Sequence, residues 1–198
     1  VIASEEKPSE GALIYADMMG KSLFIFRVGK RPLTEGMRLL GAHIDSPRLD
    51  LKQHPLYEDQ ELALFDTHYY GGIKKYQWVT IPLALHGVVV KKDGSAVQIC
   101  IGEKEEDPVV GVSDLLIHLA AKQVDQKVAD AVTGENLNVL IGSRPMEGEE
   151  KEAVKGNILA ILKKEYGIEE EDFVSAEIEV VPAGPARDYG LDRSMLMG

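Results

Sequence analysis

A β-hairpin signal in the middle of the chain places the strongest constraint on its fold. Residues 92–95 read Lys-Asp-Gly-Ser and separate two apolar runs, 88–90 and 97–101. An Asp-Gly pair between such runs favours a tight turn between antiparallel strands, because Gly accepts the positive φ that the turn requires. In the second run apolar side chains alternate with Gln98 and Cys100, so one face is expected to be buried. Cys100 is interpreted as an ordinary strand residue, since no base lies beside it in the sequence.

Further strands are expected on both sides of this hairpin. Residues 12–43 read as strands with a turn at 29–32, and residues 66–90 are rich in Thr, Tyr, Trp and Val, which are typical of strands. A short strand is expected at 137–141. In residues 174–180 apolar side chains alternate with Ser and Glu, which predicts a half-buried strand.

Two helices are expected. One begins near Ser113, with later leucines at helical spacing. The clearest helix follows the acidic residues 149–152, which suit the positive end of a helix dipole. Lys163 and Lys164 fall in its last turn, and Gly167 fits the position just beyond its end. Its buried stripe is expected to comprise Val154, Ile158, Ile161 and Leu162.

Composition and charge exclude several classes of partner. The chain has 198 residues, 44% of them hydrophobic, which fits a globular protein. Its formal net charge of −11 argues against nucleic acid and anionic membranes as partners. One cysteine and no long apolar stretch favour a cytoplasmic protein without membrane spans. The start, Val-Ile-Ala-Ser-Glu-Glu, predicts no signal peptide, and without an initiating methionine the chain is expected to be a processed or excised piece.

The stretch LLGAHIDSPRLDL contains the main candidate for a metal site. The apolar run 37–40 resembles a buried strand, and Ser46-Pro47 breaks it into a loop. His43 and Asp45 would lie on one face of an extended segment, where an imidazole can bind zinc and a carboxylate can orient it. An H-x-D motif is weak by itself, and the alternative is a strand-end histidine beside a loop aspartate.

Other polar and aromatic residues are interpreted as structural. Three histidines without ligand spacing are expected in surface or core positions: His54, His68 and His86. Glu177 and Glu179 resemble paired carboxylates for acid–base work but are interpreted as a solvated strand face. Of the remaining candidates, Glu58 and Asp66 are expected to be loop carboxylates, and Tyr76 and Trp78 are expected to pack in an inserted domain or a subunit contact. Asp188 and Asp192 could approach the site in a complete enzyme, but they are not taken as site residues.

The segment GAHIDSPRLDLK closely resembles the metal-binding strand end of the aspartyl aminopeptidase and aminopeptidase I family of zinc metallopeptidases. Four later segments are similar to blocks of that family in the same order: THYYGGIKKYQW, PLALHGVVVKKDG, LLIHLA and SAEIEVVPAGPARDYGLDRS. The resemblance extends from about Gly29 to Gly198. Several long blocks in order are far more specific than H-x-D alone.

The resemblance implies an α/β and α+β architecture. Residues 1–50 would begin an α/β catalytic domain of the zinc-exopeptidase type, and residues 51–173 would form an inserted domain that mixes a β-barrel-like sheet with helices and builds subunit contacts. Residues 174–198 would return to the catalytic domain. The polar, turn-rich residues 54–59 fit a boundary, and residues 184–198 are expected to be a loop.

The resemblance also implies hydrolysis of N-terminal residues from peptides at a two-metal zinc centre, with a glutamate as general base. His43 matches a metal ligand, and Asp45 matches the acidic residue that supports this histidine and the metal pair in catalysis. His118 matches a histidine that the inserted domain donates to the substrate site of a neighbouring subunit. The family's other ligands lie beyond Gly198, so this chain alone is expected to be inactive and not to bind the two Zn²⁺ ions fully.

Two alternatives remain open from the sequence. Residues 51–173 have the size of an independent domain, so the chain is alternatively a non-catalytic homo-oligomerisation module. A related zinc exopeptidase of another family is the other alternative, since some of these also use an H-x-D strand, although the later blocks argue against it.

Overall fold

The computed structural model describes residues 8–197, and the chain divides into two compact units, Val1–Ile44 and Asp45–Gly198. Each unit is described by itself. Across residues 8–197, no helix has the length and apolar character needed to cross a membrane.

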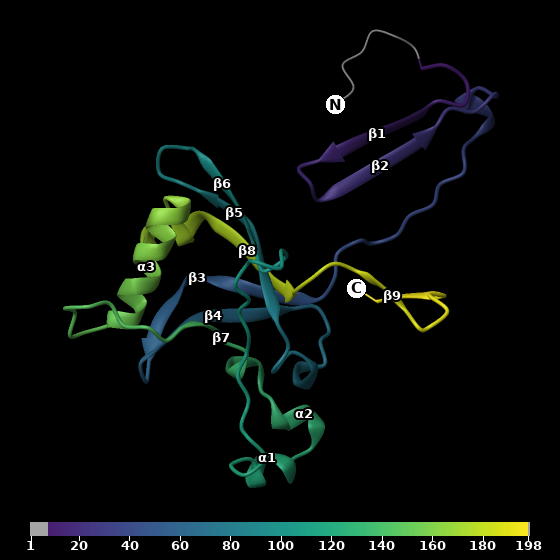
Figure 1. Cartoon of the computed structure of the whole chain (residues 1–198). Helices are drawn as coiled ribbons and strands as arrows, with labels where there is room; N and C mark the ends of the chain where they lie inside the picture. The colour runs from purple at the N-terminus through teal and green to yellow at the C-terminus, as the bar shows by residue number, and fades with distance from the viewer. Residues whose placement is uncertain (1–7, 198) are drawn as a thin grey trace. The chain divides into compact units, whose positions relative to one another are not determined.

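The first unit contains a β-hairpin. Strands β1 (Leu13–Met18) and β2 (Ser22–Arg27) pair antiparallel (Figure 1). Their turn is closed by the Gly20 amide, which donates to the Asp17 side chain at 2.8 Å. A short 3-10 helix, η1 (Leu33–Glu35), follows.

The buried strand predicted at 37–43 does not form. Residues 37–47 have no regular secondary structure, and Leu39 is 83% exposed. A strand requires a neighbour to satisfy its backbone groups, and among residues 8–197 no strand pairs with this segment. His43 and Asp45 therefore lie in an extended loop and not at the end of a strand.

The second unit is built on a six-stranded antiparallel sheet of order β6-β5-β8-β3-β4-β7 (Figure 1). Its strands are β3 (Arg48–Asp59), β4 (Leu62–Tyr70), β5 (Leu83–Val90), β6 (Ala96–Ile101), β7 (Val139–Gly142) and β8 (Ala176–Pro182). The predicted hairpin is β5–β6, with Ile99 buried and Cys100 exposed as expected. A mixed α/β fold is thus confirmed.

Strand β3 corrects the expectation of a turn at 54–59. The strand runs through this segment, and its pairing with β4 shifts register between Leu51 and Leu56. Pro55 is fully buried there. The bulge accommodates the proline, which cannot donate a backbone hydrogen bond, without ending the strand.

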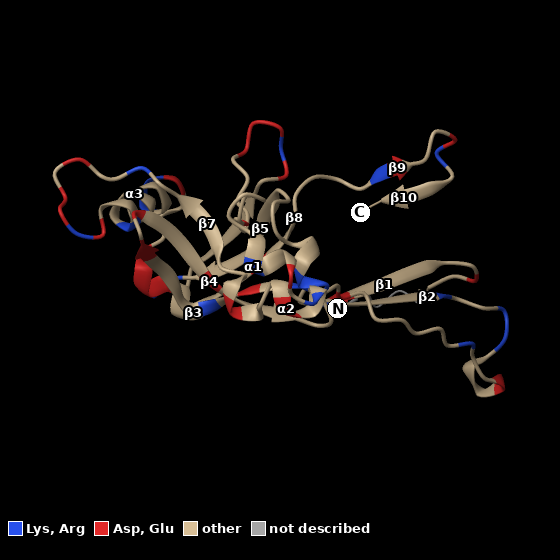
Figure 2. Ribbon diagram, turned by 90° about the horizontal axis from the view of Figure 1, so that it is seen from below, with Lys and Arg blue, Asp and Glu red and all other residues tan. Residues whose placement is uncertain are grey.

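Helix α3 (Ala153–Tyr166) covers part of the sheet. Val154 is buried, and Ile158, Leu159 and Leu162 pack against the core, whereas Ile161 is 40% exposed, contrary to prediction. Gly167 adopts the left-handed conformation that ends the helix, as expected. The preceding loop carries both acidic and basic residues (Figure 2).

The first turn of α3 is capped from a distant strand. Glu58 Oε2 in β3 accepts hydrogen bonds from the amides of Val154 and Lys155, both at 2.9 Å. The helix starts after residues 149–152, so their glutamates are not in its first turn. Glu58, expected in a loop, therefore supplies the negative charge at this helix start. Asp66 is likewise in a strand, β4, where it pairs with Lys52 at 3.0 Å.

The helix predicted from Ser113 is wrong. Residues 113–116 lack regular structure and residues 117–119 form a turn; only then do the one-turn helices α1 (Ala121–Val124) and α2 (Val128–Ala131) and the 3-10 helix η3 (Gly134–Asn136) follow. The four apolar side chains of the segment are 56–71% exposed: Leu115, Leu116, Ile117 and Leu119. Helical spacing alone is insufficient when no apolar face is buried.

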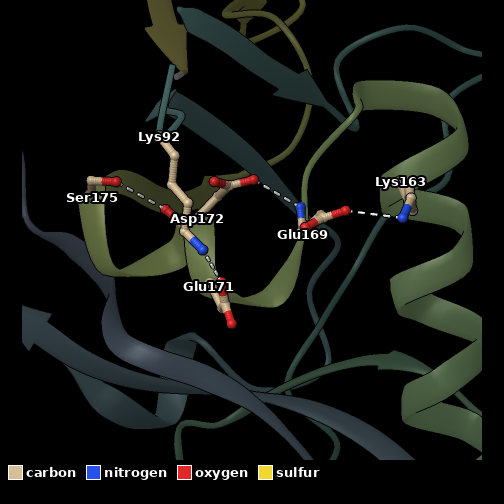
Figure 3. Close-up of polar contacts among 6 residues, drawn as sticks. All are labelled: Lys92, Lys163, Glu169, Glu171, Asp172 and Ser175. Carbon is tan, nitrogen blue, oxygen red and sulfur yellow. Dashed lines mark hydrogen bonds and ion pairs between the residues drawn. The ribbon is translucent and has the colours of Figure 1, made fainter. Parts of the chain in front are cut away.

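The 3-10 helix η4 (Glu170–Ser175) joins α3 to β8. Its capping box includes the Glu169 amide, which donates to Asp172 at 2.9 Å, and Lys163 binds the Glu169 side chain at 2.9 Å (Figure 3). From the β5–β6 turn, Lys92 binds Glu171, while Ser175 donates to the Val90 carbonyl. The hairpin predicted from Asp93-Gly94 is therefore fixed to the segment that precedes β8.

Three further short elements complete the second unit. A 3-10 helix, η2 (Lys75–Gln77), precedes Trp78. Trp78 is buried, as the sequence predicted, whereas Tyr76 is exposed. Residues 184–198, expected to be a loop, contain a small antiparallel pair, β9 (Arg187–Tyr189) and β10 (Met195–Met197).

Candidate functional site

Asp45 is held by the end of strand β4. The Tyr70 hydroxyl donates to Asp45 Oδ2 at 3.1 Å. The Arg48 guanidinium lies over the Tyr70 ring, 4.3 Å from its centroid, a distance at which a cation is attracted to the ring face. The Asp45 carboxylate is therefore held by an aromatic side chain of the six-stranded sheet.

Arg48 is itself fixed by two carboxylates. Its Nε lies 2.8 Å from Asp50 and 3.1 Å from Glu179, and its side chain is only 17% exposed. Burial opposes the charge, but the hydrogen bond to Asp50 and the charges of Asp50 and Glu179 outweigh it and raise the pKa of Arg48. Glu179, interpreted from sequence as solvated, is thus half of an ion pair between β3 and β8.

A row of polar residues crosses the sheet at the same level. In the strand register Cys100 faces His86, His86 faces Glu179, Glu179 faces Asp50, and Asp50 faces His68. Directly paired residues lie on one face of a sheet, so these side chains share the face opposite the buried Leu49 and Val180. Within this row, His86 Nε2 lies 2.6 Å from Glu103 Oε1 and forms a hydrogen bond with it.

These residues do not assemble a complete zinc site. Among residues 8–197 no three His, Cys, Asp or Glu side chains lie close enough together to hold a metal ion. A catalytic zinc takes about three protein ligands. His43 and Asp45 supply donor types that zinc takes, an imidazole and a carboxylate, but among residues 8–197 the ligand set is incomplete.

His118 lies on the exposed turn 117–119 and not on a helix. The adjacent groove, of about 800 Å³, is lined by Leu115 and Leu119 together with residues of α1 and by Asn136 and Asn138 beyond α2. The groove is partly polar: Asn138 donates to the Tyr57 hydroxyl at 2.8 Å. An exposed histidine within an apolar turn suits a surface that another molecule covers.

Sequence reasoning missed Arg48 and Tyr70. Both belong to blocks that the resemblance singled out, RLDLK and HYYGG, but neither block alone indicates that the two side chains meet. Arg48 and Tyr70 meet because they are paired residues of antiparallel strands, and this pairing follows from the register of β3 against β4.

Comparisons with known proteins show the family. The family model described as aminopeptidase I zinc metalloprotease (M18) matches residues 4–198. A protein named probable M18 family aminopeptidase 1 from Clostridium acetobutylicum is 62% identical over 199 residues, covering 100% of this chain and 43% of that protein. A protein of the same name from Thermotoga maritima is 55% identical over 183 residues, covering 92% and 40%.

Solved structures agree. The crystal structure of aminopeptidase I from Clostridium acetobutylicum has a TM-score of 0.87 at 61% identity and covers 96% of this chain and 42% of that one. The M18 aminopeptidase from Thermotoga maritima has a TM-score of 0.87 at 54% identity, covering 94% and 41%. The chain thus spans about two-fifths of the length of these relatives, and it belongs to the aminopeptidase I family of zinc metalloproteases (M18).

Proposed function

We propose that this chain is part of a zinc-dependent aminopeptidase that removes N-terminal residues, acidic ones among them, from peptides at a two-metal centre. The observation that carries the proposal is the family match over residues 4–198, which includes the H-x-D motif. In this proposal His43 is a zinc ligand. Asp45 supports that histidine, and a carboxylate held by a hydrogen bond, as Asp45 is held by Tyr70, suits this role.

The remaining ligands would come from the part of the relatives that the chain does not span. Residues 1–50 and 174–198 would belong to the catalytic domain, and residues 51–173 would form the inserted domain. The 198-residue chain alone is then inactive, because it lacks a three-ligand group among its described residues.

Activity of the full-length protein tests this proposal. It should release the N-terminal residue from a panel of aminoacyl p-nitroanilides, lose that activity on dialysis against EDTA, and regain it with Zn²⁺. The panel also shows whether acidic residues are preferred. No hydrolysis of any member by zinc-loaded protein would refute the proposal.

We further propose that residues 51–173 form a homo-oligomer in which His118 reaches the peptide site of a neighbouring subunit. The support is the exposed apolar turn around His118, which a second copy would cover. A distant relative in fold, with 18% identity and a TM-score of 0.61, is described as a dodecamer of mApe1 from S. cerevisiae. Sedimentation that finds only monomer at high micromolar concentration would refute the oligomer.

Mixing two inactive full-length variants tests the role of His118. His118→Ala should lower turnover strongly and leave zinc content and oligomer size unchanged. Exchange of its subunits with those of His43→Ala should restore part of the activity, because one subunit then supplies the histidine and another the metal ligand. No recovery despite demonstrated exchange would show that His118 does not act in trans.

A non-catalytic assembly module is the second candidate, and the observation that favours it is the lack of a three-ligand group among residues 8–197. Association without hydrolysis by the full-length protein would support it. Under either function we place the protein in the cytoplasm, because the one cysteine of these 198 residues, Cys100, is exposed and forms no disulfide. Cell fractionation tests this placement.

A further inference from the structure

We propose that Tyr70 is a positioning residue for Asp45, and that the end of strand β4 fixes the position of the Asp45 carboxylate. The inference rests on the proposed function and adds to it a residue outside the motif. Asp45 lies in a segment without regular secondary structure. A carboxylate that orients a metal ligand must itself be held in place, so a contact from outside the segment is needed.

Tyr70 provides that hold through its hydroxyl. The O–H donates to Asp45 Oδ2 at 3.1 Å, and a hydrogen bond to a charged acceptor is stronger than one between neutral groups. Tyr70 is the last residue of β4, so its backbone is fixed by the pairing with Arg48 of β3. A rigid strand end thus determines where the carboxylate oxygen lies.

The Tyr70 ring is held from its face. Arg48 lies 4.3 Å from the ring centroid, and Asp50 and Glu179 fix the guanidinium in turn. These contacts extend from β8 through β3 to the ring. They involve the ring and not the hydroxyl, so removal of the hydroxyl alone leaves them in place.

The loop makes a second contact with the same strand end. A Cβ added at Gly71 would lie 3.5 Å from Pro47 Cγ, so the backbone after Tyr70 passes directly beside Pro47. Gly71 has a φ of +74°, which favours glycine and lets the chain turn away after this contact. Asp45 and Pro47 are therefore both anchored at residues 70–71.

The consequence for the proposed site is specific. In the proposed site Asp45 supports His43, which lies two residues before it. Removal of a residue that supports a metal ligand typically lowers metal affinity or activity by about 10- to 100-fold. The Tyr70–Asp45 bond is exposed to solvent, so we expect the lower end of this range.

Tyr70→Phe in the full-length protein is the test, with Tyr69→Phe as matched control. Tyr69 is the preceding tyrosine of β4, and its ring stacks on His68, with centroids 5.4 Å apart, so its hydroxyl can be removed without touching the Asp45 contact. Zinc affinity is measured by competition with a chromophoric chelator, and kcat and KM are measured separately. Tyr70→Phe should weaken zinc binding and lower kcat about tenfold with KM unchanged, and Tyr69→Phe should match the wild type.

A double-mutant cycle separates positioning from a general structural effect. In the Asp45→Ala background, Tyr70→Phe should have almost no further effect, because the acceptor of the Tyr70 hydroxyl is already absent. A full tenfold loss in that background, or wild-type zinc affinity and kcat in Tyr70→Phe, would overturn the inference while the wild type remains active. A wild-type protein without zinc-dependent activity would instead refute the proposed function, and this inference with it.

Discussion

The cap of helix α3 by Glu58 gives a prediction whose size follows from the structure. Glu58→Ala removes the carboxylate that accepts from the amides of Val154 and Lys155, each at 2.9 Å. These are two of the amides that a helix start leaves without an internal partner. The helix has no acidic residue in its own first turn to replace the charge.

The magnitude is that of a partly buried cap. Loss of a capping side chain costs about 0.5–2 kcal/mol, and bonds to a charged group are at the upper end of hydrogen-bond energies. We therefore expect α3 to lose about 2 kcal/mol in Glu58→Ala. Glu58→Gln keeps an acceptor but loses the charge that suits the helix dipole, so about half that loss is expected.

Amide hydrogen exchange along α3 measures this loss directly. A loss of about 2 kcal/mol corresponds to about 30-fold faster exchange of the interior amides of the helix. Glu61→Ala, an exposed acidic position in the β3–β4 turn, serves as the control and should leave α3 unchanged. Unchanged α3 exchange in Glu58→Ala, or the same acceleration in both variants, would refute the capping role.

Two further predictions concern stability. Gly87→Ala should destabilise the sheet by about 3 kcal/mol, because the added Cβ would overlap the Glu177 carbonyl oxygen of β8. Gly72→Ala, with open space around it, should be nearly neutral in the same urea titration. The hydrogen bond to Glu170 raises the pKa of Lys155 above 10.5, despite burial. A raised pKa in the folded state means that the contribution, about 1 kcal/mol, is complete below pH 10.5 and is lost as the pH rises through the folded-state pKa. The melting difference between wild type and Lys155→Met should therefore shrink above pH 10.5, and a constant difference would contradict the ion pair.

Local apolar patterns predicted the strands and the helix in which buried side chains recur at regular spacing. The alternation around Ile99 and Ile178 gave β6 and β8, and the spacing around Val154 gave α3, because in each case one face is covered within the same unit. The same logic failed at Leu115 and Leu39, whose apolar patterns are real but whose side chains are exposed. An apolar pattern shows that one face of a segment is hydrophobic, but it does not show whether another part of the chain packs against that face.

Contacts between distant segments were not accessible from the sequence. Glu58 and Val154 are 96 positions apart, and Arg48 meets Glu179 only because β8 pairs with β3. The resemblance named His43, Asp45 and His118, and these roles remain predictions. It did not name Tyr70, since its role depends on the strand register and on the loop passing beside it.

Zinc content of the full-length protein tests the central claim most directly. Metal is measured by mass spectrometry in wild type, His43→Ala and the control His54→Ala, an exposed histidine of β3. We predict that wild type and His54→Ala retain the same zinc content and activity, whereas His43→Ala loses zinc together with activity. Full zinc content and full activity in His43→Ala would contradict the account.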